Sequence, residues 1–491
     1  MHTSMQSCAF SCKSVCVCPA FCCAELPLIE AVKAGDLKRL QLELTAGADL
    51  NATDPHGRGS AVSYAASLGR EECLQALLEA GADPEVRTEV PFLNISMTPL
   101  YAAAAQGHPG CVRLLLQHGA AHDTRSQGDG TPLLGAAMEG HRKCVEALLE
   151  GGCDIELATS YGQTPLMCAA QYGRAECLRA LVKAGAQLDC HMTVSGDNAL
   201  ISAVKGDFLE CVEILISAGA NLEGGTDNGS TAVMVAAARG HTACLKALLR
   251  AGARVDQTTN LGVTAAMFAC HAGSVECLEA ILDAGADPNS VGGDPSFTAL
   301  YVAAAEGHLD CVKLLLARGT NPAAVMDGGE TALTIAAKQG HEGCVRALLE
   351  AGAPTESLQS LLFSVAAEGA RENRPRNALI GAMPRNGPSP TAALFEAAAA
   401  GHVGCVQALL QAGAVTEVAC TPFAVTPLTI AGMMGHTQIV RMLLEAGADP
   451  NAKTINGGTA IRHARNSGQT ECERLLREAG ALESDDEDDS S

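Results

Sequence analysis

A segment of about 33 residues recurs along this 491-residue chain, and the recurrence constrains the fold more than any other feature. Two strong copies read TPLLGAAMEGHRKCVEALLEGGCDI from Thr131 and TPLMCAAQYGRAECLRALVKAGAQL from Thr164. From Thr98 to Thr331, successive copies begin 33 or 34 residues apart. A period this regular indicates a structural module stacked many times. Weaker copies that bring the total to fourteen units begin at Leu26, Ser60, Asn198, Ser360 and Ala392.

Each unit predicts two short helices and an extended connection. Thr131 is a typical N-cap, and Pro132 occupies the first helical position, where its missing N–H costs nothing. Gly140 is placed to end this helix. A second helix follows, with Cys144 and Leu148 among the apolar residues of one face. Such a unit is too small to bury its own apolar face, so stability must come from stacking on its neighbours.

The pattern TPL/TAL…AA…GH…CV..LL..GAD resembles the ankyrin repeat family over about residues 26–482. The resemblance implies an α-class repeat solenoid of paired antiparallel helices with projecting β-fingers and a concave face that binds other proteins. The chain departs from the family where a His usually follows Thr-Pro-Leu. We therefore expect the hydrogen bonds of that His to be absent and stacking to depend more on apolar contact. The residues found at this position are Tyr101, Leu134, Met167, Tyr301 and Thr429.

The repeat pattern divides the chain into five segments. We expect a disordered Cys-rich segment at 1–25, repeats one to ten at 26–357 and repeats twelve to fourteen at 392–482. Residues 358–391 keep a first-helix pattern but contain prolines that oppose a regular second helix, so they predict a degenerate repeat or a hinge. Residues 483–491, ESDDEDDSS, predict a disordered acidic tail.

Composition and motifs argue against several functions. The formal charge of −22 repels phosphate backbones, which argues against nucleic-acid binding. Aromatic residues make up only 3% of the chain, and no stretch supplies the roughly 20 consecutive apolar residues of a membrane-spanning helix. No metalloprotease, P-loop, serine-hydrolase or paired CxxC motif occurs. We therefore expect no enzymatic activity, no cofactor and no metal site.

Cysteine and histidine recur in register with the repeat, which favours structural roles. Eleven of the 22 Cys occupy one apolar position of the second helix, so we expect buried, reduced thiols and a protein of the cytoplasm or nucleus. Seven His follow the helix-ending Gly, where we expect turn residues rather than metal ligands. The eleven Cys are Cys73, Cys111, Cys144, Cys177, Cys211, Cys244, Cys277, Cys311, Cys344, Cys405 and Cys472, and the seven His are His108, His141, His241, His308, His341, His402 and His436.

The two terminal segments carry separate hypotheses. Cys16, Cys18, Cys22 and Cys23 form a cluster that suits reversible acylation, while a weak signal peptide, a zinc cluster and a segment without function stay open as alternatives. Ser484 precedes three acidic residues, a pattern typical of an acidophilic kinase site.

The resemblance implies a non-catalytic scaffold or adaptor, which we expect to be a monomer that binds other proteins along its concave face. Two alternatives are a substrate-receptor subunit of a ubiquitin ligase and an adaptor tethered to a membrane through acylated N-terminal Cys. In the family the concave face is formed by finger residues and by the two residues before the Gly that ends the first helix. Mapped onto this chain, the candidate partner-binding residues are Tyr161, Tyr172, Arg239, His271, Lys338, Met433 and Met434.

Overall fold

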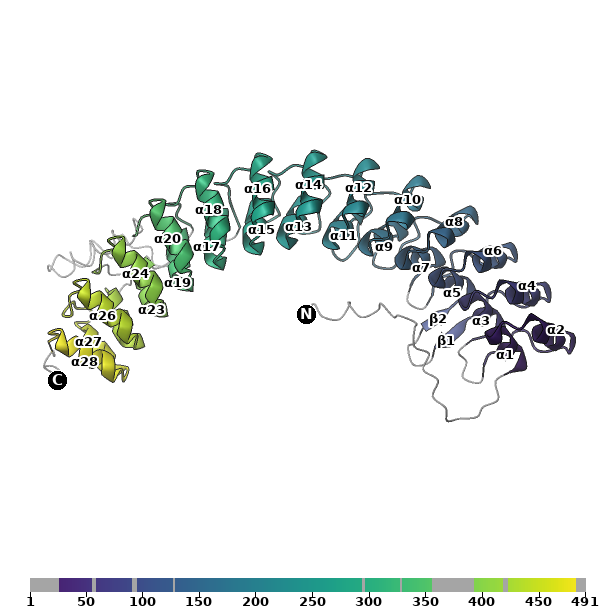
Figure 1. The fold of residues 1–491 in the computed structure, drawn as a ribbon, viewed down its shortest axis with the longest axis horizontal. Coiled ribbons are helices and arrows are strands. Elements are labelled where there is room, and N and C mark those ends of the chain that lie inside the picture. The colour runs from purple at the N-terminus through teal and green to yellow at the C-terminus, as the bar shows by residue number, and fades with distance from the viewer. Residues whose placement is uncertain are drawn as a thin grey trace. The chain divides into compact units, whose positions relative to one another are not determined.

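The computed structural model describes residues 26–54, 59–90, 95–126, 129–293, 296–326, 329–355, 393–417 and 423–482. These residues form two compact units, one of residues up to 169 together with 176–186, and one of 170–175 together with residues from 187 onward. Within each unit, short helices alternate in pairs and successive pairs stack on one another (Figure 1). The predicted α-class repeat fold is confirmed.

The first unit begins with four helix pairs and includes one short sheet. Its two strands, β1 (Thr88–Val90) and β2 (Ile95–Met97), pair antiparallel with Thr88 opposite Met97. The boundary between the units passes through the fifth pair, α9 (Pro165–Gln171) and α10 (Ala175–Lys183). The four preceding pairs are α1 (Pro27–Ala34) with α2 (Leu37–Thr45), α3 (Ala61–Ser67) with α4 (Glu71–Glu79), α5 (Pro99–Gln106) with α6 (Pro109–Gln117), and α7 (Pro132–Glu139) with α8 (Arg142–Glu150).

The second unit contains eight further described pairs and a second short sheet. Its strands, β3 (Val291–Gly292) and β4 (Phe297–Thr298), pair antiparallel with Val291 opposite Thr298. The pairs are α11 (Ala199–Lys205) with α12 (Leu209–Ser217), α13 (Ala232–Arg239) with α14 (Thr242–Arg250), α15 (Ala265–Ala272) with α16 (Val275–Asp283), α17 (Ala299–Glu306) with α18 (Leu309–Ala317), α19 (Ala332–Gln339) with α20 (Glu342–Glu350), α23 (Ala393–Ala400) with α24 (Val403–Gln411), α25 (Pro427–Met434) with α26 (Thr437–Glu445), and α27 (Ala460–Asn466) with α28 (Thr470–Glu478).

The predicted capping residues begin and end these helices. At α19, the Thr331 hydroxyl accepts a hydrogen bond from the Thr334 backbone N–H, and the Thr334 side chain accepts one from Thr331 N–H in return. This reciprocal pair satisfies two of the donors that a helix start leaves free. Gly340 then ends α19 at a φ of 80°, in the left-handed region that glycine enters without steric cost.

The core between stacked pairs is built from small and aliphatic side chains. All eleven Cys of the second-helix position are buried, which confirms that prediction. They lie among fully buried Leu and Ala such as Leu315, Ala303 and Ala304. Small residues let the helices approach closely, so a low aromatic content is compatible with a continuous core.

Histidines that precede the second helices join adjacent repeats, a contact beyond the turn role predicted for them. His341 begins α20, and its Nε2 lies 3.0 Å from the Ala305 carbonyl oxygen of the preceding repeat. A Cβ on Gly307 would come within 2.5 Å of the His341 ring, so this glycine provides the space that the ring occupies. Five further histidines bond a carbonyl of the preceding repeat in the same way: His108, His141, His308, His402 and His436. The sequence predicts these histidines only as turn residues, because their contact with the preceding repeat depends on how closely the repeats stack.

The helices on the two sides of residues 356–392 pack directly on one another. Helix α19 packs against α23, and α20 packs against α24. His402, at the start of α24, makes its inter-repeat hydrogen bond of 3.0 Å to the Lys338 carbonyl oxygen of α19. Among the described residues, the tenth repeat and the repeat beginning at Ala393 therefore pack as neighbours in the stack. The predicted hinge or degenerate repeat at 358–391 lies outside the described residues.

Candidate protein-binding surface

Five of the predicted partner-binding residues lie at the C-terminal ends of first helices in the second unit. Arg239 ends α13 and is exposed. His271 in α15 and Lys338 in α19 are also exposed, and each faces a carboxylate: His271 Nδ1 lies 3.2 Å from Glu306 Oε1, and Lys338 Nζ lies 3.2 Å from Glu330 Oε1. At α15 and α19, the first-helix end therefore places a basic side chain beside a carboxylate of the same chain.

Helix α25 ends differently, because its last two residues are Met433 and Met434. Met433 is partly buried, and the side chain of Met434 is half exposed. Methionine is flexible and polarizable, so such a surface adapts to apolar partners of different shape. The first-helix ends thus carry charged residues at α13, α15 and α19 and apolar ones at α25.

The two predicted tyrosines fall in different units. Tyr161 lies in the connection before α9, in the first unit, and its side chain is 54% exposed. Tyr172 follows the last residue of α9, in the second unit, and is 40% exposed. Both rings are accessible, as a contact with another protein requires. Their combination into one patch stays a prediction.

The connections between repeats, here called fingers, have a fixed base. In the second unit the Asp189 Oδ1 accepts a hydrogen bond of 2.9 Å from Asn221 N, and the same contact recurs one repeat later from Arg254 N to Glu223 Oε1. Finger tips are joined as well, because Gly293 N donates to the Leu261 carbonyl at 2.8 Å. The fingers therefore form a ladder of hydrogen bonds, with side-chain acceptors at the base and backbone groups at the tips.

Large apolar side chains on these fingers are exposed, and the sequence analysis missed them. They share a place in the extended connection before the capping residue of a first helix, and nearly half or more of each side chain is accessible. The sequence does contain a signal for them: each is a large apolar residue in an otherwise polar connection, where it cannot belong to the apolar face of a helix. We call these residues of the second unit the finger row: Val194, Leu261, Val291, Val325, Phe423 and Ile455.

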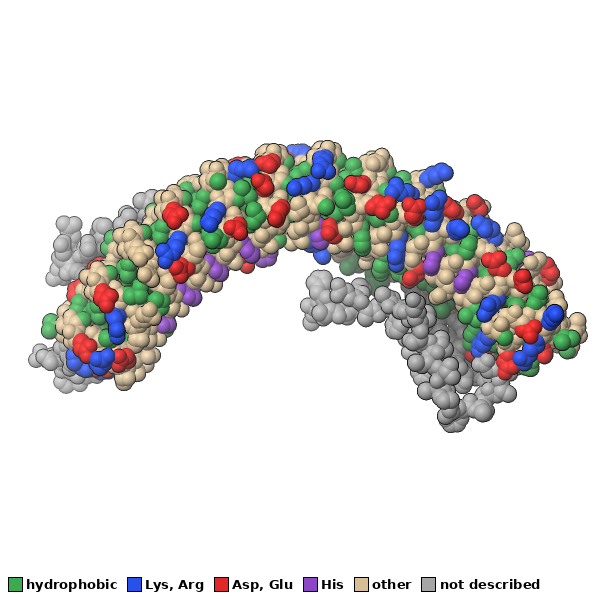
Figure 2. All heavy atoms as spheres, viewed as in Figure 1, with side chains coloured by type: hydrophobic (Ala, Val, Ile, Leu, Met, Phe, Trp, Pro, Cys, Tyr) green, Lys and Arg blue, Asp and Glu red, His purple; other side chains and the backbone are tan. Residues whose placement is uncertain are grey.

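The core thiols beneath this surface are protonated. Burial raises the pKa of Cys144 and of Cys344 to about 11, and that of Cys111 to about 12, so these thiols stay protonated near neutral pH. Figure 2 shows acidic and basic side chains interspersed over the second helices, while histidines gather along the edge formed by the first helices α15 to α23. Within the described part of the chain, no group of three or more His, Cys, Asp or Glu could hold a metal ion.

Two sets of predicted sites lie outside the described residues. These are the candidate lipidation sites Cys16, Cys18, Cys22 and Cys23, and the candidate phosphorylation site Ser484. Among the described helices, none has both the length and the apolar character that a membrane crossing needs.

Comparison with known proteins gives a consistent family. The family model described as ankyrin repeats in three copies matches residues 28–126, 88–159, 133–225, 220–292, 290–359 and 370–454. The ankyrin repeat protein nuc-2 of Neurospora crassa is 42% identical over 69 residues, which are 14% of this chain and 6% of that protein. XBAT31 of Arabidopsis thaliana, a proposed E3 ubiquitin-protein ligase, is 32% identical over 103 residues, which are 20% of this chain and 23% of that protein.

Among solved structures, the human ASB11 ankyrin repeat domain is similar, with a TM-score of 0.42 and 26% sequence identity. The match covers 46% of this chain and 99% of that domain. The chain thus matches less than a quarter of the length of the two curated relatives.

Proposed function

Because this chain belongs to the ankyrin repeat family, we propose that it is a non-catalytic scaffold or adaptor that binds partner proteins through its fingers and first-helix ends. The finger row is the observation that carries the proposal. Leu261, Val291 and Val325 lie on three consecutive fingers. Phe423 and Ile455 lie on two fingers joined by a hydrogen bond of 2.9 Å from Ile455 N to the Phe423 carbonyl. Neighbouring exposed apolar groups of this kind are typical of protein interaction sites. The hydrogen-bonded ladder beneath the row limits the conformational entropy that binding must offset.

A protein partner agrees better with the charge of the chain than a nucleic acid does. The formal charge is −22, and the exposed Lys338 and His271 side chains are already paired with carboxylates. Phosphate binding needs unpaired cations to replace counterions. We infer that the partners are proteins, and that the chain binds them as a monomer.

The fifteen described free cysteines favour a reducing compartment, and we propose that the protein works in the cytoplasm or nucleus. Fourteen of them are buried, so they act as small apolar core residues. A ubiquitin-ligase receptor and a membrane-tethered adaptor are the finer alternatives, and each uses the same binding surface. The similarity to XBAT31 covers a segment of repeats only, and it favours neither of these two alternatives.

The proposal is tested by affinity capture of the full chain from cells, followed by mass spectrometry. The variant Phe423→Asp with Ile455→Asp places two charges in the finger row, and should lose partners that the natural chain captures. The control is Leu42→Asp, because Leu42 is also well exposed but lies on α2, outside the fingers. Partners that are retained by both variants, or the capture of no specific partner, would contradict the proposed function.

A second variant tests the predicted tyrosines. Tyr161→Ala combined with Tyr172→Ala should weaken partner binding by about 2 kcal/mol or more, because exposed tyrosines often dominate interface energies. Normal partner affinity in this double variant, measured by titration with a captured partner, would assign the two rings no role in binding.

A further inference from the structure

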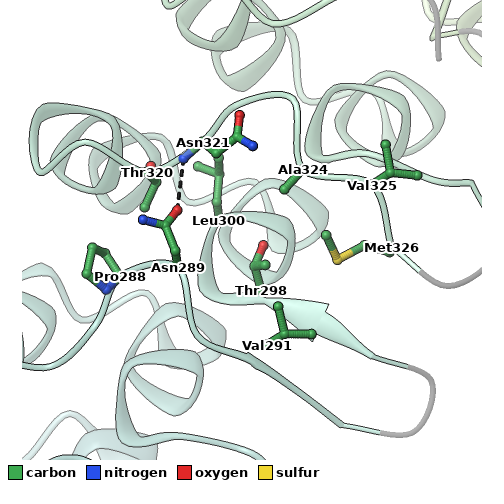
Figure 3. A pocket seen from close by; sticks show the side chains of 10 residues that line it. All are labelled: Pro288, Asn289, Val291, Thr298, Leu300, Thr320, Asn321, Ala324, Val325 and Met326. Carbon is green, nitrogen blue, oxygen red and sulfur yellow. Dashed lines mark hydrogen bonds between the residues drawn. The ribbon is translucent and has the colours of Figure 1, made fainter. Parts of the chain in front are cut away.

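A cavity of about 390 Å³ lies between two consecutive fingers of the second unit. One finger joins α16 to α17 and contains β3 and β4, and the other joins α18 to α19. Figure 3 shows side chains of both fingers around the opening, with Leu300 and Thr298 between them. The lining residues are Pro288, Asn289, Val291, Thr298, Leu300, Thr320, Asn321, Ala324, Val325 and Met326. The volume lies in the range of ligand sites.

The chemistry of the lining selects an uncharged guest. None of the lining residues carries a charge, and most are apolar. The polar groups are largely engaged: Asn289 Oδ1 accepts a hydrogen bond of 2.9 Å from Asn321 N, and Thr298 Oγ1 accepts one of 3.2 Å from Tyr301 N. A charged group in this cavity would lose its hydration without gaining a partner of opposite charge.

Thr320 is an exception among the equivalent residues of the chain. The position after the second-helix glycine holds a buried alanine in neighbouring repeats, as at Ala253, Ala353 and Ala448. Thr320 is only 6% exposed, and its hydroxyl has no hydrogen-bond partner within the part of the chain that the structure describes. An unpaired buried hydroxyl destabilises the folded state, so the fold alone would favour alanine here. Rotation about χ1 would exchange the hydroxyl with the methyl group and change which of them faces the cavity.

The cavity continues an exposed apolar surface. Val291 and Val325 form part of its lining and are 62% and 50% exposed. Leu261 lies on the preceding finger, and its carbonyl accepts the hydrogen bond from Gly293, two residues after Val291. Three consecutive fingers thus offer exposed apolar side chains, and a cavity opens between the last two.

We propose that this cavity receives one uncharged aliphatic side chain from an extended segment of a partner protein, with Leu261, Val291 and Val325 contacting the same segment. The Thr320 hydroxyl then bonds a backbone group beside the inserted side chain. This proposal rests on the proposed function and assigns it one site.

The stacking distance predicts the pattern of the segment. Packed helices lie about 8–10 Å apart, so fingers of successive repeats recur at a similar spacing. A polyproline II strand rises 3.1 Å per residue and returns to the same face every third residue, at about 9 Å. The partner segment should therefore carry aliphatic residues at every third position. Because the chain has a net charge of −22, neutral or basic residues should separate them.

The test is selection of displayed random twelve-residue peptides on the full chain, followed by measurement of Kd by fluorescence anisotropy. Selected peptides should carry aliphatic residues three apart. Val325→Asp should raise their Kd at least thirtyfold, and Thr320→Ala about fivefold. Leu42→Asp is the control, since Leu42 is an aliphatic residue of 69% exposure on α2, outside the fingers, and this variant should change Kd less than twofold. Thr320→Ala introduces the residue of the neighbouring repeats, so its Tm should not fall.

Three outcomes would overturn the site. Peptides could bind Val325→Asp and Leu42→Asp equally, or bind Thr320→Ala as tightly as the natural chain, or fail to be selected at all. If cellular partners still depend on Phe423 and Ile455, only the cavity assignment is wrong. If that dependence is also absent, the proposed function fails with it.

Discussion

The helices and the fingers of the second unit use the same kinds of apolar residue in opposite ways. The helices bury leucine, alanine and cysteine completely, as at Leu315 and Cys311. The fingers expose Leu261, Val325 and other large apolar side chains, and their tips are joined to the next repeat by single backbone hydrogen bonds. Stability is therefore concentrated in the helices, which leaves the finger side chains available for partners.

The largest difference in unfolding free energy is expected between the truncation of a leucine in a helix and the truncation of a leucine in a finger. Leu315→Ala in α18 empties a fully buried site and should cost about 2–5 kcal/mol of unfolding free energy. Leu261→Ala, at 65% exposure, should change it by less than about 0.5 kcal/mol. Denaturant unfolding of both variants measures the contrast. Similar losses would show that the fingers contribute to the core.

A pair of glycine variants isolates the histidine contact between repeats. Gly319→Ala and Gly307→Ala each place alanine at a φ near 80°, which costs about 1–2 kcal/mol. The new Cβ on residue 319 meets nothing within 4 Å, whereas on residue 307 it displaces the His341 ring from Ala305. Gly307→Ala should therefore cost about 1 kcal/mol more, in line with one lost hydrogen bond. If the two variants unfold at the same temperature, the histidine hydrogen bond does not contribute to the stability of the stack.

The buried thiols of the second helices predict a dependence of stability on pH. Burial raises the pKa of Cys144 from near 9 to about 11, so the folded chain holds a proton that the unfolded chain loses between these values. The thiol contribution is complete below about pH 8.5 and is lost as the pH rises toward 11. Between pH 8 and 10, Cys144→Ala should lose about 1 kcal/mol less stability than the natural chain. Parallel slopes in denaturant titrations at several pH values would refute this.

The smallest effect on stability is expected for the two exposed tyrosines. Tyr161→Ala with Tyr172→Ala should leave the unfolding free energy within about 0.5 kcal/mol of the natural chain, because both rings are exposed. Circular dichroism melts would check this. An early unfolding transition would place these rings among the groups that stabilise the stack.

The sequence predicted the features that repeat and missed those that occur once. The buried Cys, the capping Thr and the His after the helix-ending Gly recur with the repeat of about 33 residues. Their position in each helix pair, and therefore their burial, can be predicted from that period. Exposure of the finger row could not be predicted in the same way, because it depends on how far each connection extends from the helices. The cavity beside Thr320 depends on individual side chains of two adjacent fingers, which no periodic pattern describes.

The contact between α20 and α24 could not be predicted from the sequence either. Residues 358–391 interrupt the regular repeat spacing, which would otherwise indicate which helix pairs are neighbours. Thr331 and Ala393 begin helices that pack as neighbours although the chain between them holds far more residues than one repeat. Proximity along the chain and proximity in the stack therefore differ at this point. Tertiary contacts decide which repeat follows which.

That packing makes the stack tolerant of chain length at one position. The connection from α18 to α19 covers residues 318–331, which is 14 residues, and the connection from α20 to α23 covers 351–392, which is 42 residues. The contacts of α19 with α23 and of α20 with α24 fix both ends of the longer connection, and a threefold increase in the length of a flexible chain costs only about 1 kcal/mol of closure entropy. Evolution, or a protein engineer, can therefore lengthen, shorten or exchange the sequence between these two helices as a cassette, while the repeats on either side keep their register.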